Sequence, residues 1–165
     1  MELASDRLGL PLLAVAQAQK EMTHNEALVL ADLAIQAVVE AVGVAAPPAT
    51  PAPGQCWMVG AEATGAWAGQ AQALAGWTAG GWRFVRPREG FRVWSKDDGC
   101  EARFVGDSWV IGEACVQRLL VNGQQVVGAR QAAITWPAGG ETIDSAARVA
   151  IGAILSALRT HGLTS

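Results

Sequence analysis

Polar residues interrupt a long apolar stretch near the start of the chain at every fourth position, over 23–42. Past the first turn these polar positions are Asp32, Gln36 and Glu40. In an α-helix this spacing places them on one narrow stripe and leaves the rest of the circumference apolar. Thr23 and Glu26 have the spacing of a capping box, and Gly43 can end a helix. We therefore predict a helix over 23–42 that needs burial on most of its sides.

A second apolar stretch with the same spacing lies near the end of the chain, over 145–160. Its interior interruptions are Arg148 and Ser156, with Gly152 between them. Asp144 has a side chain suited to an N-cap, and Gly162 can end the helix. We predict a helix here too, again with apolar side chains on most of its sides.

Between the two helices, short β-prone segments alternate with glycine-rich turn signals. These segments are 56–59, 74–77, 82–85, 91–94, 101–105 and 109–111. Short strands at near-regular spacing predict an antiparallel meander, in which Trp82, Phe84 and Trp94 should point inward by alternation. Further on, Asn122-Gly123 separates two short β-prone segments, 119–121 and 124–127. This pattern predicts a β-hairpin with a two-residue turn.

These elements indicate an α+β protein with four parts. The parts are an N-terminal segment and helix (1–43), a spacer (44–54), a Trp-rich β module (55–112), and a hairpin followed by the C-terminal helix (113–165). The spacer carries no charge and holds four of the 7 prolines in the chain, so we expect it to be extended and stiff.

The two helices pose a burial problem for a chain of 165 residues. Either both pack on the sheet of their own copy, or several copies associate and bury the helices in bundles around a common axis. We favour association, because one copy could cover both helices only with its β module sandwiched between them. The interface would then use Leu28, Ala31, Ile35, Val38, Ile151, Ile154, Leu155 and Leu158.

Composition and charge exclude several classes of protein. Hydrophobic residues make up 51% of the chain and charged residues 16%, which excludes a disordered chain. The net charge of -3 argues against a nucleic-acid binder. A group of arginines near Trp82 and Phe91 has acidic neighbours, so we interpret it as a solvated hairpin face. Its members are Arg83, Arg86, Arg88 and Arg92. Acidic residues also interrupt or precede the apolar runs, so we expect neither membrane insertion nor secretion.

The cysteines do not form a recognisable metal or disulfide pattern. Cys56, Cys100 and Cys115 are widely spaced and have no histidine nearby in the sequence. Zinc sites and disulfide frameworks need closer or paired spacing. We expect three buried, reduced thiols and no bound metal.

Residues with catalytic potential are few and scattered. His24 and His161 have no nucleophile at a motif spacing. Asp97-Asp98 is more simply a turn before Gly99 than a pair of catalytic carboxylates. A glycosidase needs two carboxyl groups facing each other across a cleft, and the acidic residues of the β module cannot be paired from sequence. The candidates are Glu89, Asp97 and Glu101. We expect no catalytic residue, no cofactor and no enzymatic activity.

Tryptophan is unusually frequent, with 7 Trp against 3 Phe and no Tyr. An indole offers an apolar face to a sugar ring and an N–H group to its hydroxyls. Most of these side chains should fill the core of so short a meander. Trp67 and Trp77 lie among Gly and Ala residues, so we take them as the exposed pair and as candidate glycan-binding residues.

Several motifs in order resemble a phage-related domain family of unknown function, which occurs in fibre-like or spike-like proteins of phages, prophages and gene transfer agents. These motifs are Leu10-Pro11-Leu12-Leu13, Gln17-Ala18-Gln19-Lys20, Thr23-His24-Asn25-Glu26-Ala27-Leu28, Ala63-Thr64-Gly65-Ala66-Trp67-Ala68-Gly69, Gly80-Gly81-Trp82-Arg83-Phe84 with Pro87 and Gly90, and Gly106-Asp107-Ser108-Trp109-Val110. The tail also resembles a C-terminal cassette of phage fibre proteins. Its matching residues are Val127-Gly128-Ala129-Arg130-Gln131, Pro137, Gly139-Gly140, Thr142, Asp144, Ala147-Arg148, Ala157-Leu158-Arg159 and His161-Gly162-Leu163.

The resemblance implies a homotrimeric virion component, made in the bacterial cytoplasm and built into a phage or phage-like particle. Its partners would be other virion proteins and, on the host, a cell-surface glycan. The chain lacks the long distal region that some members carry, which weakens the case for an elaborate receptor-binding role. A carbohydrate-binding module that oligomerises, and a polysaccharide-acting enzyme, remain the alternative functions.

Overall fold

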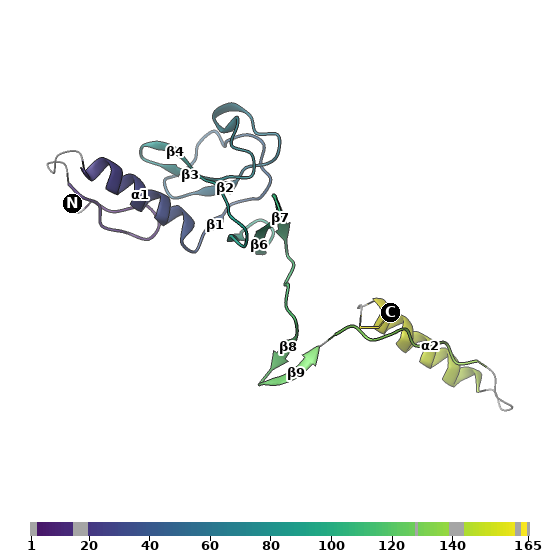
Figure 1. The fold of residues 1–165 in the computed structure, drawn as a ribbon. Helices are drawn as coiled ribbons and strands as arrows, with labels where there is room; N and C mark the ends of the chain where they lie inside the picture. Colours follow the sequence, from purple (N-terminus) through teal and green to yellow (C-terminus); the bar gives the residue numbers. More distant parts are fainter. Residues whose placement is uncertain (1–2, 15–19, 128, 139–143, 161–162, 165) are drawn as a thin grey trace. The chain divides into compact units, whose positions relative to one another are not determined.

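The structure, a computed structural model, describes residues 3–14, 20–127, 129–138, 144–160 and 163–164 (Figure 1). The chain separates into two compact units, Met1–Glu113 and Ala114–Ser165. Helices and sheets occupy separate segments, and neighbouring strands are mostly antiparallel. The predicted α+β class is therefore confirmed.

The first unit contains one helix and two small sheets. Its elements are α1 (Lys20–Ala34), β1 (Val38–Val39), β2 (Cys56–Met58), the 3-10 turn η1 (Gly65–Trp67), β3 (Leu74–Thr78), β4 (Gly81–Val85), β5 (Arg92–Ser95), β6 (Cys100–Val105) and β7 (Ser108–Ile111). One sheet has the order β2-β3-β4, and the other has the order β1-β5-β6-β7. All six predicted segments of the β module are strands, with ends that shift by one residue at most. They form two sheets where we expected one continuous meander.

The predicted N-terminal helix is shorter than expected and starts earlier. α1 begins at Lys20, so Thr23 and His24 lie inside the helix and the predicted capping box is wrong. The helix ends at Ala34, well before Gly43. Gln36 then adopts a positive φ of 47°, and Val38–Val39 pairs in parallel with β5. Pairing with β5 and burial of Val39 override the helical periodicity, because β-branched residues fit a strand at least as well as a helix.

A buried carboxylate ties the N-terminal segment to α1. Asp32 is 2% exposed and accepts hydrogen bonds from Ser5 Oγ at 2.8 Å, Arg7 N at 3.0 Å and Leu8 N at 2.6 Å. Asp32, which the periodicity places on a narrow polar stripe, is therefore a buried contact and not part of an exposed surface. Three donors from one loop satisfy the carboxylate, as a buried charge requires.

The guanidinium of Arg7 caps the carboxyl end of the same helix. It donates to the carbonyl of Asp32, to those of Leu33 and Ile35 at 3.2 Å each, and to that of Gln36 at 2.8 Å. The last carbonyls of a helix have no intrahelical partner, and a cation there also interacts favourably with the helix dipole. This contact explains why α1 can end within an apolar run that has no glycine.

α1 lies beside the sheet β2-β3-β4 (Figure 1) and contacts it closely at Gly76. Leu33 is 1% exposed, and a Cβ added to Gly76 would lie 2.4 Å from its Cδ2 atom. Glu26 of α1 and Arg83 of β4 form an ion pair at 2.7 Å. One copy of the chain thus covers part of the apolar surface of α1 by itself.

The proline-containing run 44–54 lies within the first unit. Val44 forms a bridge with Val59 at its start, and Gly54 N donates to the carbonyl of Trp77 at 2.9 Å at its end. Thr64 N also donates to Ala45 O at 2.8 Å. The run therefore connects two segments of one compact unit.

The second unit contains the predicted hairpin and helix. β8 (Leu119–Val121) pairs with β9 (Gln124–Val127), and the turn residues Asn122 and Gly123 have φ of 50° and 77°. Two positive φ values are typical of a type I′ turn, which confirms the hairpin. α2 spans Ser145–Thr160, as predicted, and Ala147 N donates to Asp144 Oδ1 at 2.9 Å, which confirms the cap. Gly162, the predicted end of this helix, and His161 lie outside the described residues.

We predict that Asp32→Asn destabilises the protein by about 2–4 kcal/mol. A neutral amide weakens three charge-assisted hydrogen bonds, and its NH2 group would face one of the three donors that now bind the carboxylate. Chemical denaturation of the full chain followed by tryptophan fluorescence measures this change. The matched control is Asp6→Asn, an exposed carboxylate in the same loop, which should change the free energy of unfolding by less than about 0.5 kcal/mol. Equal effects of the two substitutions would contradict the role assigned to Asp32.

Candidate functional site

The second unit buries very few of its own side chains. Among its described residues, only Gly152, Leu155 and Thr164 are buried. Of the buried hydrophobic residues in the part of the chain that the structure describes, Leu155 alone belongs to this unit. Yet, among the described residues, the unit contributes twelve of the eighteen exposed large hydrophobic side chains, although it makes up under a third of the chain. A unit this small with so little core does not reach ordinary domain stability alone.

One face of α2 is covered by its own chain. A Cβ added to Gly152 would lie 2.2 Å from the Cζ3 atom of Trp136, so the glycine forms a notch for the indole. Arg159 lies over the same ring, 5.8 Å from its centroid. Leu155, also buried, is three residues from Gly152 and therefore shares its side of the helix. Gly152, predicted to lie on a polar stripe, thus marks the covered face.

Another face of α2 carries two adjacent rows of apolar residues. The first row is Ala147, Ile151, Ile154 and Leu158, and the second is Ala146, Ala150, Ala153 and Ala157. Ile151 is 44% exposed and Ile154 is 59% exposed. Within each row the spacing is four, three and four residues, which is the heptad spacing of helices that pack against helices. We name these two rows the heptad face.

The hairpin β8–β9 is exposed along both of its strands. Its large apolar side chains, at 41–54% exposure, are Leu119, Leu120, Val121, Val126 and Val127. An isolated two-stranded hairpin is marginally stable in water. The hairpin and the heptad face thus both present apolar side chains that the second unit does not bury by itself.

The structure brings together only part of the predicted interface. Ile151, Ile154 and Leu158 share the heptad face, whereas Leu155 faces its own chain. In the first unit, Leu28 and Ala31 are half-buried in α1, Ile35 lies past the end of that helix and is 50% exposed, and Val38 belongs to β1. These four do not form one helical row, because the helix ends between Ala31 and Ile35.

The predicted pair of exposed tryptophans is also corrected. Trp67 is 0% exposed, and its ring contacts those of Trp57 and Trp82 at centroid distances of 6.3 and 5.1 Å. Trp77 is half-buried, with its ring 5.0 Å from that of Trp82. The buried Trp67 cannot stack on a sugar. Its location in a 3-10 turn that folds over the sheet could not be read from neighbouring Gly and Ala residues.

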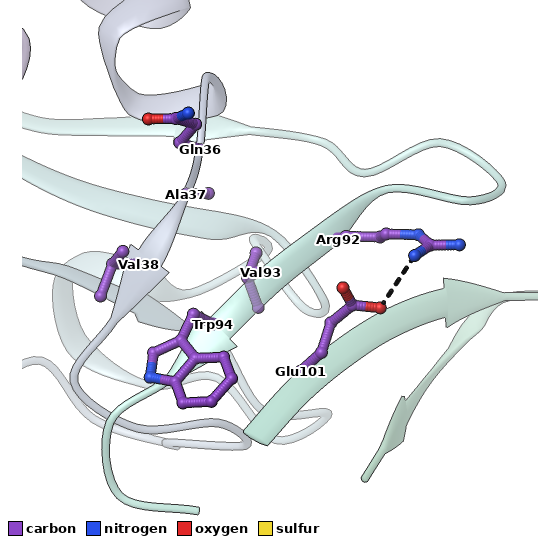
Figure 2. A pocket seen from close by; sticks show the side chains of 7 residues that line it. All are labelled: Gln36, Ala37, Val38, Arg92, Val93, Trp94 and Glu101. Atoms are coloured by element: carbon purple, nitrogen blue, oxygen red, sulfur yellow. Dashed lines mark ion pairs between the residues drawn. The ribbon is translucent and has the colours of Figure 1, made fainter. Parts of the chain in front are cut away.

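Trp94, predicted to point inward, is instead 50% exposed. It lines a hollow of about 270 Å³ beside Gln36 and Val38, shown in Figure 2. Arg92 and Glu101 also line this hollow and form an ion pair at 3.2 Å. The expected alternation holds in β5, where Val93 and Ser95 are buried, but its phase is opposite to the prediction. Trp82 and Phe84, predicted to point inward too, are half-buried.

Comparison with known protein families identifies the first unit of this chain. Residues 24–110 match a family described as protein of unknown function, DUF2793. The chain belongs to this family. No curated protein matches it. The matched DUF2793 segment lies within the first unit and contains β1–β6 and most of α1 and β7, including Trp94 and its hollow. The heptad face and the hairpin lie outside it.

The described residues of the DUF2793 chain contain no group of three or more histidine, cysteine or acidic side chains placed to hold a metal ion. In the same part of the chain, no helix is long and apolar enough to span a bilayer. Asp98-Gly99 forms a turn, in which Ser95 Oγ donates to Asp98 Oδ2 at 2.5 Å and Gly99 has a φ of 64°, so the turn interpretation is confirmed.

The cysteines differ from one another in burial. Cys56 is buried, Cys100 is half-buried and Cys115 is exposed, so the prediction of buried thiols holds only for Cys56. All three are free, as expected. Burial raises the pKa of the Cys56 thiol to about 11. The thiolate is the reactive form, so Cys56 is protected twice, by its low ionisation and by its neighbours.

We predict that iodoacetamide at pH 8 alkylates Cys115 rapidly and leaves Cys56 unmodified in the folded protein, because a pKa of about 11 leaves only about one thiol in a thousand ionised. Peptide mass spectrometry after short labelling times measures both sites in one sample. In urea both cysteines should react. Comparable labelling of the two sites without denaturant would contradict the burial of Cys56.

Proposed function

We propose that the protein is a non-enzymatic structural component of a phage or phage-like particle, such as a fibre, spike or adaptor, and that it works as a homotrimer. The observation that carries this proposal is the exposed apolar surface of the second unit. Taken by itself, this unit leaves the heptad face and both strands of the hairpin uncovered. Copies of the same chain are the simplest cover, because equal faces meet around a symmetry axis.

Two features of α2 favour association around an axis. The heptad face combines large side chains, such as Ile151 and Ile154, with a row of alanines that lets helices approach closely. The side with Gly152 is already covered by Trp136 of the same chain, and the heptad face is left for other copies. Alanine-rich faces do not fix the number of helices in a bundle. The number three and the particle context come from the resemblance to phage fibre and spike proteins.

The first unit has the opposite character. Among the residues that the structure describes, it contains all but one of the buried hydrophobic side chains, so it has a core of its own. We infer that assembly is the task of the second unit and that the first unit is the part presented to other virion proteins or to the host surface. A role in host attachment belongs to this proposal as well.

Two other functions receive less support. A polysaccharide-acting enzyme needs two facing carboxyl groups, whereas Glu101 is paired with Arg92, and Glu89 Oε2 accepts a hydrogen bond from Gly106 N at 2.9 Å. A carbohydrate-binding module that oligomerises would use the same second unit. It differs from the proposed component only in not being part of a particle.

We predict that the full chain elutes as a trimer in size-exclusion chromatography with light scattering, and that Ile154→Asp weakens association about 100-fold or more. The substitution places one carboxylate per copy in the apolar interface, where burial and mutual repulsion both oppose association. Light scattering over a concentration series measures the shift toward monomers.

The matched control is Ile35→Asp, which changes the same residue type at a similar exposure, 50% against 59%, in the first unit. It should leave the trimer intact. A wild-type chain that remains monomeric at high micromolar concentration would overturn the assembly proposal. Dissociation by Ile35→Asp, with Ile154→Asp still trimeric, would move the interface to the first unit.

We predict that the chain co-sediments with phage-like particles when it is expressed with an epitope tag in its own bacterial host, and that Ile154→Asp is absent from the particle fraction. Density-gradient centrifugation followed by immunoblotting measures the distribution. Equal soluble expression of both forms is the control. A wild-type chain found only in the soluble fraction, in cells that produce particles, would overturn the particle assignment while leaving the trimer untouched.

A further inference from the structure

We propose that the outer face of the sheet β1-β5-β6-β7 holds a binding site for a small neutral saccharide, centred on Trp94. The site lies entirely in the first unit and does not depend on the assembly proposed above. The inference comes from the placement of one exposed indole, one ion pair and one amide around a single hollow (Figure 2).

Strand register places the required side chains on one face. Val39, Val93, Ser95 and Ala102 are buried on the inner face of the sheet. Trp94 pairs with Val38 on one side and with Glu101 on the other, and directly paired residues share a face. Arg92 is two residues from Trp94 and therefore lies on this outer face as well. Val38, Arg92 and Glu101, one from each of three strands, thus share this face with the indole.

The hollow has the size of a small ligand. Its volume is about 270 Å³, near the lower end of the range for small-molecule pockets. Its lining residues are Gln36, Ala37, Val38, Arg92, Val93, Trp94 and Glu101. The half-exposed ring of Trp94 and the side chain of Val38 provide an apolar floor. An indole face accepts the C–H side of a sugar ring, and the partly polar character of Trp suits a site that is wet at one edge.

The polar groups that line the hollow match hydroxyl groups. Arg92 Nη1 and Glu101 Oε1 are 3.2 Å apart, and their side chains are 60% and 46% exposed. The guanidinium donates hydrogen bonds and the carboxylate accepts them, and the amide of Gln36 can do both. Neighbouring sugar hydroxyls also donate and accept. Because the two charges cancel, the site has no preference for an anion, which favours a neutral saccharide over an acidic one or a nucleic acid.

The backbone around the hollow is fixed before any ligand arrives. Arg7 Nη2 donates to the carbonyl of Gln36 at 2.8 Å and holds this residue in its left-handed conformation. Trp94 N donates to Ala37 O at 2.8 Å, and Lys96 N donates to Val39 O at 2.9 Å. A preorganised site loses less conformational entropy when a ligand binds.

The other exposed tryptophan does not offer a comparable face. Trp136 is 53% exposed, but its ring closes over Gly152 and lies under Arg159. A protein partner would need a much larger apolar area than one indole provides, since stable interfaces bury about 800 Å² on each side. The chemistry at Trp94 therefore points to a single sugar ring or a short oligosaccharide.

The test uses the full chain and an array of neutral oligosaccharides containing glucose, galactose, mannose or N-acetylglucosamine, with sialylated and sulfated counterparts beside them. Isothermal titration calorimetry then measures the affinity for the best neutral saccharide. Trp94→Ala should weaken this affinity about tenfold or more, through loss of the stacked ring. Glu101→Gln should weaken it several-fold, since one charged acceptor is lost. The matched control, Ile111→Ala, removes an exposed apolar side chain of β7 outside this hollow and should bind like wild type.

Circular dichroism of each variant separates loss of binding from loss of folding. Unchanged affinity in a folded Trp94→Ala variant, or no binding of wild type to any neutral saccharide at millimolar concentration, would overturn the site. Binding of only the sialylated or sulfated saccharides would also overturn it. The Ile154→Asp variant should keep its affinity in calorimetry and lose only the multivalent signal on the array, so failure of the assembly proposal can be told from failure of this one.

Discussion

The carboxyl end of α1 is held by two charged side chains, and the arrangement of the first unit depends on them. Arg7 satisfies the last carbonyls of the helix, and the N-terminal loop in turn satisfies the buried Asp32. Since these carbonyls have a partner, the helix can end at Ala34 within an apolar run. The chain then reverses through Gln36 and supplies β1 to the sheet. The wall of the hollow beside Trp94 is a direct consequence of this helix end.

The two units differ in how far they bury their own apolar side chains. The first fills its interior with two groups of side chains, an aliphatic cluster that includes Leu33, Met58 and Leu74, and a group of three tryptophans. Trp82 contacts Trp57 and Trp67 edge to face, and Trp57 and Trp67 meet at a tilt of 44°. The second places Trp136 against one side of α2 and leaves the heptad face exposed. A unit of the first kind has a core of its own in one copy. A unit of the second kind is explained most simply as part of an assembly, and this difference carries the proposed division between assembly and presentation.

Local signals predicted several elements well. The turn residues Asn122-Gly123 require positive φ, so they identify the hairpin without any tertiary information. Asp144 marks the start of α2 by another local signal: its side chain accepts a hydrogen bond from the backbone amide of Ala147 in the first turn of the helix. The segments of the β module are short, β-prone and bounded by glycine-rich turns, and each is a strand. Membership of the chain in its family likewise follows from residues in sequence order.

The sequence by itself determined where the strands, the hairpin and α2 form, because these depend on contacts between residues close together in the chain. It also determined that α2 carries more apolar surface than one side needs. Only the tertiary structure decided that α1 ends at Ala34, that Val38–Val39 becomes a strand, and that Trp67 is buried while Trp94 is exposed. The physical reason is distance along the chain: Arg7 and Asp32 are 25 residues apart, and Val38 and Trp94 belong to strands separated by most of the module. Periodicity within one segment contains no information about such partners.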